Sequence, residues 1–109
     1  MSYPQSISLF GHNISVEVFN EPIPYEIKGE ECFIMGEYVP HSTTLKVVDV
    51  PEKPSIGRCN FIHEVIEGIN YHADLKLNHT QITTLASAFY QCFTEAQMMS
   101  FDLATTTIQ

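Results

Sequence analysis

The chain has 109 residues, the size of one domain, and its 44% hydrophobic content is enough for one packed core but not for two. Thirteen acidic residues against five lysines and arginines give a formal charge of −8, which argues against a nucleic-acid partner, because phosphate binding requires a cationic surface. No apolar run approaches the roughly 20 residues that span a bilayer, and the first five residues lack the features of a signal peptide. We therefore expect a single cytoplasmic domain over residues 1–109 with no membrane partner.

The first half of the chain has the composition of short β-strands separated by turns. Strands are predicted over residues 6–10, 14–19, 32–39 and 43–48. Residues 11–13 form a turn between the first two, and residues 40–42 form a turn that makes a hairpin of the last two. Residues 20–31 contain two prolines and a glycine and are expected to be an irregular connection.

The second half of the chain is predicted to form two helices. Between residues 58 and 71, apolar residues recur at the i, i+3, i+4 and i+7 positions of a helix, at Ile62, Val65, Ile66 and Ile69. A short loop follows, and Asn78 with Gln81 can form a capping box that starts a second helix running to about residue 98.

This order of elements predicts an α+β fold. The short connection favours two antiparallel helices, packed on a small antiparallel sheet formed by the preceding strands. Residues 104–109, which include three consecutive threonines, are expected to be a frayed tail.

The first predicted helix carries polar residues suited to binding a metal ion. His63 and Glu67 are four residues apart and therefore share one face, which Asn70 extends by a further turn. An imidazole and a carboxylate on neighbouring turns can both bind zinc. Glu64 is rotated by about 100° from His63, which suits a general base acting on water at the metal. The alternative is that His63 and Glu67 form only a surface pair.

A catalytic zinc site normally has three protein ligands, so a third is needed. We favour His79, which lies in the first turn of the second helix and can return to the face of His63. His72 stays open as the alternative, although a role at the end of the first helix suits it better. The remaining histidines, His12 and His41, lie in predicted turns and are expected to be exposed.

Residues 58–91 resemble small phage and prophage proteins of the zincin-like metallopeptidase type. That group has a helix of the form His-Glu-x-x-His-Ala-Ile-(Asp/Asn)-Tyr, a leucine-rich loop and a second helix that ends near Leu-Tyr-Gln. The matching segments here are His63-Glu64-Val65-Ile66-Glu67-Gly68-Ile69-Asn70-Tyr71, Leu75-Lys76-Leu77 and Phe89-Tyr90-Gln91. The strand Thr44-Leu45-Lys46-Val47 looks like the edge strand that lies beside the active-site helix in such proteins.

The resemblance implies a zinc-dependent, peptidase-like hydrolase of phage or prophage type. His63, Glu67 and His79 would hold the zinc, Glu64 would be the catalytic base, and Asn70 would orient a ligand. This chain departs from the pattern of the group at Glu67, because the group has its second histidine at this position. In the group, an acidic residue often occupies the position that matches His79. The histidine and the acidic ligand are therefore exchanged between these two positions here. A peptide substrate could lie along the strand at 43–48.

The alternative function is non-enzymatic. On that reading, the chain is a phage accessory or inhibitor protein that uses an acidic surface on a zincin-like scaffold to bind a protein partner. The oligomeric state stays open.

Overall fold

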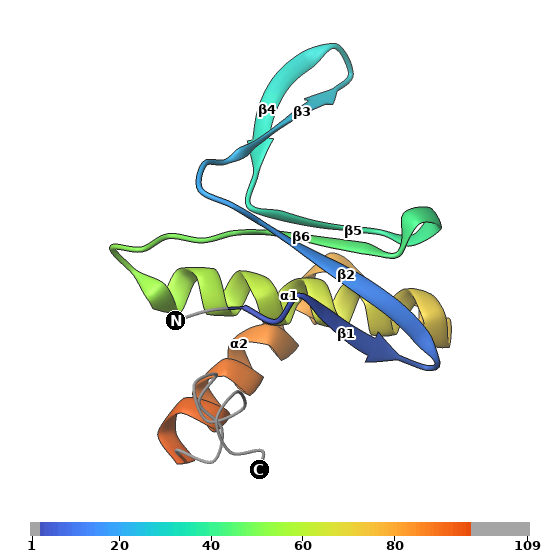
Figure 1. Cartoon of the computed structure of the whole chain (residues 1–109), viewed down its shortest axis with the longest axis vertical. Helices are drawn as coiled ribbons and strands as arrows, with labels where there is room; N and C mark the ends of the chain where they lie inside the picture. Colours follow the sequence, from blue (N-terminus) through green and yellow to red (C-terminus); the bar gives the residue numbers. More distant parts are fainter. Residues whose placement is uncertain (1–2, 97–109) are drawn as a thin grey trace.

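The computed structural model in Figure 1 describes residues 3–96, with the backbone alone for residues 93–96. Its elements are β1 (Ser6–Leu9), β2 (His12–Phe19), β3 (Ile23–Ile27), β4 (Glu30–Ile34), β5 (Gly36–Val39), a 3-10 turn η1 (Pro40–Ser42), β6 (Thr44–Val48), α1 (Pro54–Ala73) and α2 (His79–Ala96). The α+β class is confirmed, because a small and mostly antiparallel sheet is followed by two helices. The tail expected at residues 104–109 lies outside the described residues.

Four strands form the main sheet in the order β1-β2-β6-β5. The pairs β1–β2 and β5–β6 are antiparallel, so the predicted hairpin at η1 is confirmed, whereas β2 and β6 are parallel. The expectation that residues 43–48 form an edge strand is wrong, because β2 pairs with β6 on the side away from β5. The strand at the edge nearest the candidate site is β5 instead.

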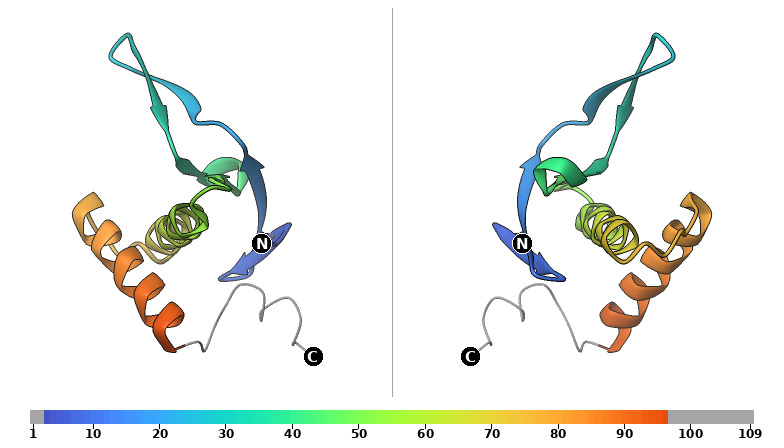
Figure 2. Two further views of the ribbon diagram at one scale, coloured as in Figure 1. Left: turned by 90° about the vertical axis from the view of Figure 1, so that its left-hand side faces the viewer. Right: turned by 90° about the vertical axis from the view of Figure 1, so that its right-hand side faces the viewer.

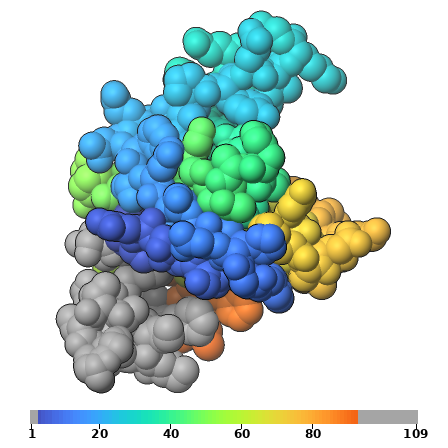
Figure 3. All heavy atoms as spheres, turned by 45° about the vertical axis from the view of Figure 1, so that its right-hand side comes forward, coloured from blue at the N-terminus to red at the C-terminus, as the bar shows by residue number. Residues whose placement is uncertain are grey.

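The remaining strands, β3 and β4, form a separate two-stranded hairpin, which we call the arm, and it stands out from the rest of the molecule (Figures 1 and 3). The prediction of an irregular connection at residues 20–31 is therefore wrong. Lys28 and Gly29 at its tip both have positive φ, of 53° and 82°, as in the two-residue turns that suit twisted hairpins. Pro24 is tolerated because a two-stranded hairpin consists of edge strands alone.

The base of the arm is held by the end of β6 and the residue after it. The carbonyl of Phe19 accepts a hydrogen bond from the Asp49 amide at 2.9 Å, and the carbonyl of Met35 accepts one from the Val48 amide at 3.0 Å. Met35 is also the point at which the chain passes from the arm into the main sheet. The single strand predicted over 32–39 is therefore divided into β4 and β5.

Helix α1 is the middle layer of the protein. On one side, Phe61 and Val65 pack against the sheet core formed by Ile14, Leu45 and Val47. On the other side, Cys59, Ile62 and Ile66 pack against Leu77, Ile82 and Ala86 of the loop and α2. The apolar residues predicted as one stripe therefore divide between two neighbours, and α2 packs on α1 rather than on the sheet.

The second helix begins as predicted. The Asn78 side chain accepts a hydrogen bond from the Gln81 amide at 2.8 Å, and the Gln81 side chain accepts one from the Asn78 amide at 2.9 Å, which confirms the capping box. From there α2 turns back and crosses α1 obliquely, as Figure 2 shows. None of the described helices has the length and apolar character required to cross a membrane.

Candidate metal centre

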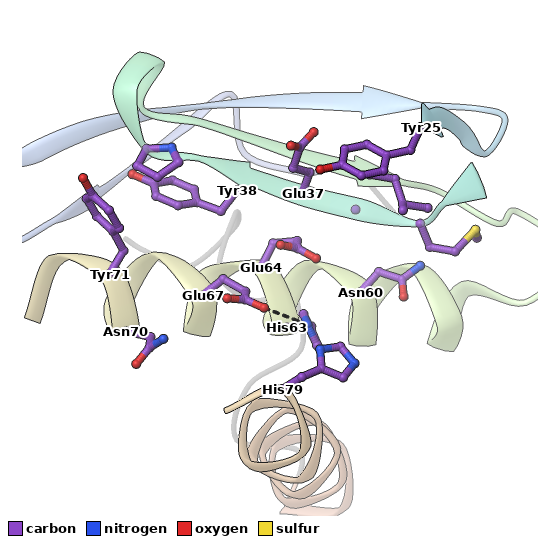
Figure 4. Close-up of a pocket in the computed structure, with 14 residues that line it drawn as sticks. Tyr25, Glu37, Tyr38, Asn60, His63, Glu64, Glu67, Asn70, Tyr71 and His79 are labelled. Atoms are coloured by element: carbon purple, nitrogen blue, oxygen red, sulfur yellow. Dashed lines mark ion pairs between the residues drawn. The ribbon is translucent and has the colours of Figure 1, made fainter. Parts of the chain in front are cut away.

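His63 and Glu67 project from one side of α1, and His79 from the first turn of α2 lies against them (Figure 4). Ligand atoms of His63, Glu67 and His79 all lie within 4.8 Å of one another. Figure 4 shows the two imidazole rings meeting between the helices, and their centroids are 5.3 Å apart. The structure thus brings together the three residues predicted as ligands, and they form a group that could hold a metal ion.

The distances within this group can be compared with those of a metal complex. Two atoms that each lie about 2.0–2.2 Å from a tetrahedral zinc ion are about 3.3–3.6 Å apart. His63 Nε2 and Glu67 Oε2 are 3.3 Å apart, which already fits such a complex. The longer separations within the 4.8 Å group involve His79, which is exposed and therefore has room to change its side-chain rotamer. Two imidazoles and one carboxylate are also a normal zinc ligand set, so the residues fit the metal.

Glu64 lies beside this group, on the side of α1 that faces β5 (Figure 4). Its exposed fraction is only 7%, and burial is the main cause that raises its pKa from the ordinary 4.5 to about 8. The neighbouring carboxylates of Glu67 and Glu37 raise the pKa further, whereas a hydrogen bond from the Tyr38 amide lowers it. In the absence of a cation, Glu64 is therefore mostly protonated at neutral pH.

Gly36 explains how a glutamate fits beneath the edge strand. A Cβ atom at this position would lie 2.9 Å from both Cγ and Oε2 of Glu64, and 3.1 Å from the carbonyl oxygen of Lys46. The missing side chain of Gly36 therefore provides the space that the Glu64 carboxyl occupies. Burial of Glu64 depends on this residue of β5 as much as on α1.

Asn70 acts on the loop before α2. Its side-chain oxygen accepts a hydrogen bond from the Leu77 amide at 2.8 Å, and its NH₂ group donates one to the Leu77 carbonyl at 3.4 Å. These contacts fix the backbone two residues before His79. Asn70 thus positions the segment that carries one candidate ligand, and no hydrogen bond from its side chain to a ligand side chain is seen among the described residues.

His72, the alternative third ligand, lies elsewhere. Its Nε2 atom is 2.6 Å from the Tyr38 hydroxyl, and its ring stacks on that of His12 at 4.2 Å. Partial burial and the neighbouring His12 lower the pKa of His72, which disfavours a cation at the end of α1. Both His12 and His41 are exposed, as expected, although His12 belongs to β2 rather than to a turn.

The candidate ligands line a cleft of about 600 Å³ that also contains residues not foreseen from the sequence. Tyr25 comes from the arm, and Glu37 and Tyr38 come from β5. The contact between Thr83 and His79 could have been predicted from the sequence, because Thr83 follows His79 by one helical turn. The Thr83 hydroxyl is 3.4 Å from His79 Nε2. No local sequence pattern predicts that the arm lies beside the cleft.

Comparison with protein-family models, with curated proteins and with solved structures gives no match for this chain. The resemblance to zincin-like proteins therefore stays a prediction.

Proposed function

We propose that this protein is a zinc-dependent hydrolase of the peptidase type. The observation that supports this proposal best is the convergence of His63, Glu67 and His79 within 4.8 Å, with the Glu64 carboxyl lining the same cleft. These groups come from α1 and the first turn of α2, and the Asn70 contacts and the capping box fix the connection between them.

Each residue has a distinct part in the proposed site. His63, Glu67 and His79 hold the metal, and zinc in such a site supplies Lewis acidity and lowers the pKa of water. Glu64 receives a proton from the attacking water and passes it on to the leaving group. Because a nearby positive charge favours an ionised carboxylate, Glu64 becomes a competent base when the ligand group is loaded.

The cleft offers room for an extended polypeptide beside β5. Among the described residues, β5 pairs only with β6, so its other edge faces away from the main sheet. The Tyr38 amide, however, already donates a hydrogen bond to Glu64. A peptide lying there could pair with only part of the β5 backbone, and side-chain contacts with the cleft must supply the rest of the recognition.

Metal content and hydrolysis, measured on the same preparations, test this proposal. We expect about one zinc per wild-type chain, a loss of zinc in His63→Ala and retention of zinc in His41→Ala, which removes an exposed histidine outside the ligand group. Glu64→Gln should keep its zinc and its fold but lose hydrolysis of a peptide panel, because an amide does not accept a proton at neutral pH. Stoichiometric zinc binding that His63→Ala does not reduce would contradict the assigned ligands.

The second candidate function is a binding protein without activity. The observation that favours it is the arm, where Tyr25, Ile27 and Phe33 are 42%, 50% and 61% exposed. Exposed apolar side chains on a projecting element are typical of an interaction surface. Zinc binding without cleavage of any peptide or protein in the panel would favour this function over hydrolysis.

A further inference from the structure

The wall of the cleft opposite α1 is formed by the arm and β5. Tyr25 and Ile34 from the arm line this wall, together with Met35 and Glu37 that follow. Figure 4 shows the Tyr25 ring with its hydroxyl end directed toward Glu37, both on the side of β5 away from α1. An aromatic ring, two apolar side chains and a carboxylate are therefore gathered at one end of the candidate site.

The charge of this region is strongly one-sided. The described residues that line the cleft include Glu37, Glu64 and Glu67 but no lysine or arginine. Glu67 contacts His63 and Glu64 is buried, whereas Glu37 forms no ion pair among the described residues. Lys46 lies opposite Glu37 on the neighbouring strand, so the two side chains share the face of the sheet away from α1, yet they form no ion pair. The Glu37 carboxylate is thus available to a cation at the outer rim of the cleft, beside β5.

We propose that Tyr25 and Glu37 form a subsite for a lysine or arginine side chain of a polypeptide bound in the cleft. The cationic end would contact the Glu37 carboxylate and the face of the Tyr25 ring, which attract a cation by charge and by the quadrupole of the ring. The aliphatic part of the side chain would pack on Ile34 and Met35. This inference rests on the proposed function, and it narrows the substrate class to polypeptides with a basic residue near the bond that is cleaved.

Binding of short peptides tests the subsite separately from cleavage. The probes are labelled hexapeptides of alanine and serine with one lysine, placed in turn at each position, and matched peptides with norleucine instead. Fluorescence anisotropy with zinc-loaded protein in the Glu64→Gln background gives each Kd. For one of the peptide positions, we expect the Kd of the lysine peptide to be at least fivefold lower than that of the matched norleucine peptide. This preference for lysine should fall as the salt concentration rises.

Variants locate the preference on the wall of the cleft. Glu37→Gln and Tyr25→Leu should each reduce it to less than twofold, whereas Tyr25→Phe, which keeps the ring, should retain most of it. The matched controls are Glu26→Gln and Phe33→Leu, which change exposed residues of the arm that do not line the cleft. Circular dichroism of each variant shows whether the fold is kept.

The outcomes separate this inference from the proposed function. No measurable binding, equal binding of lysine and norleucine peptides in every register, or a preference that survives both Glu37→Gln and Tyr25→Leu would overturn the subsite. If wild-type protein cleaves peptides without regard to basic residues, the subsite fails while the hydrolase stands. If lysine is preferred through Glu37 but nothing is cleaved, the subsite stands while the hydrolase fails.

Discussion

Replacing Glu64 by glutamine should change how the stability of the metal-free protein depends on pH. The glutamate ionises near 4.5 in the unfolded chain and near 8 in the folded protein. Below pH 4.5 it is protonated in both states and has no effect on the pH dependence. Between pH 4.5 and 8 the unfolded state loses the proton while the folded state keeps it, so the free energy of unfolding falls as pH rises. Above pH 8 this loss is complete.

The size of the effect follows from the two pKa values. Each pKa unit corresponds to about 1.4 kcal/mol, so a rise from 4.5 to about 8 removes about 5 kcal/mol of stability across this pH range. This is a large part of the roughly 5–15 kcal/mol that stabilises a typical domain. Glutamine keeps the shape and does not titrate. Glu64→Gln should therefore gain about 5 kcal/mol relative to the wild type between pH 4.5 and 8.5.

Urea denaturation in the presence of a chelator measures this difference. The chain has no tryptophan, so unfolding is best followed by far-UV circular dichroism, at intervals from pH 4.5 to 8.5. Glu26→Gln, which removes an exposed carboxylate on the arm, is the matched control and should follow the wild type closely. If the wild-type and Glu64→Gln curves run parallel over the whole range, the buried and mostly protonated state of Glu64 is refuted. Added zinc should flatten the wild-type curve, because a nearby cation favours the ionised carboxylate.

Two further substitutions test the framework that carries the site. Ile66 is 6% exposed and lies between α1 and α2, so Ile66→Asp buries a carboxylate there. This variant should have a free energy of unfolding lower by more than about 3 kcal/mol. A variant with unchanged urea denaturation would show that α2 does not pack there. Asn70→Ala removes both hydrogen bonds to Leu77, and should destabilise the fold by about 1–2 kcal/mol and weaken zinc binding by about tenfold, because His79 is then held less firmly. Zinc affinity equal to that of the wild type, measured by competition with a chromophoric chelator, would argue against this positioning role.

The parts of the fold that local patterns could predict are those formed by residues close in sequence. The i,i+4 spacing placed His63 beside Glu67, and the capping box at Asn78 fixed the start of α2 and therefore the position of His79. The parallel pairing of β2 with β6 could not be predicted, because it joins segments separated by the whole arm and leaves no local trace.

Two features of the site depended on contacts that the sequence does not reveal. The burial of Glu64 could not be predicted, because it depends on Gly36, which lies on a strand distant in sequence and leaves space for the carboxyl. The arm was missed because Pro22 and Pro24 disfavour a strand in general, and the exception for edge strands applies only once the pairing is known. Without the arm, Tyr25 could not be placed at the cleft.

The way in which the arm is attached has a consequence for how this protein can vary. The two ends of the arm are held at Phe19 and Met35. The backbone carbonyls of these residues accept hydrogen bonds from Asp49 and Val48, which are neighbours in the sequence. Residues inserted or deleted at its tip therefore leave the register of the four-stranded sheet unchanged, and a longer tip costs little additional chain entropy. The length and composition of the arm can therefore change without disturbing α1 and α2. One wall of the cleft is in this sense an exchangeable module, and under the proposed function an exchange of the arm should alter which polypeptides bind.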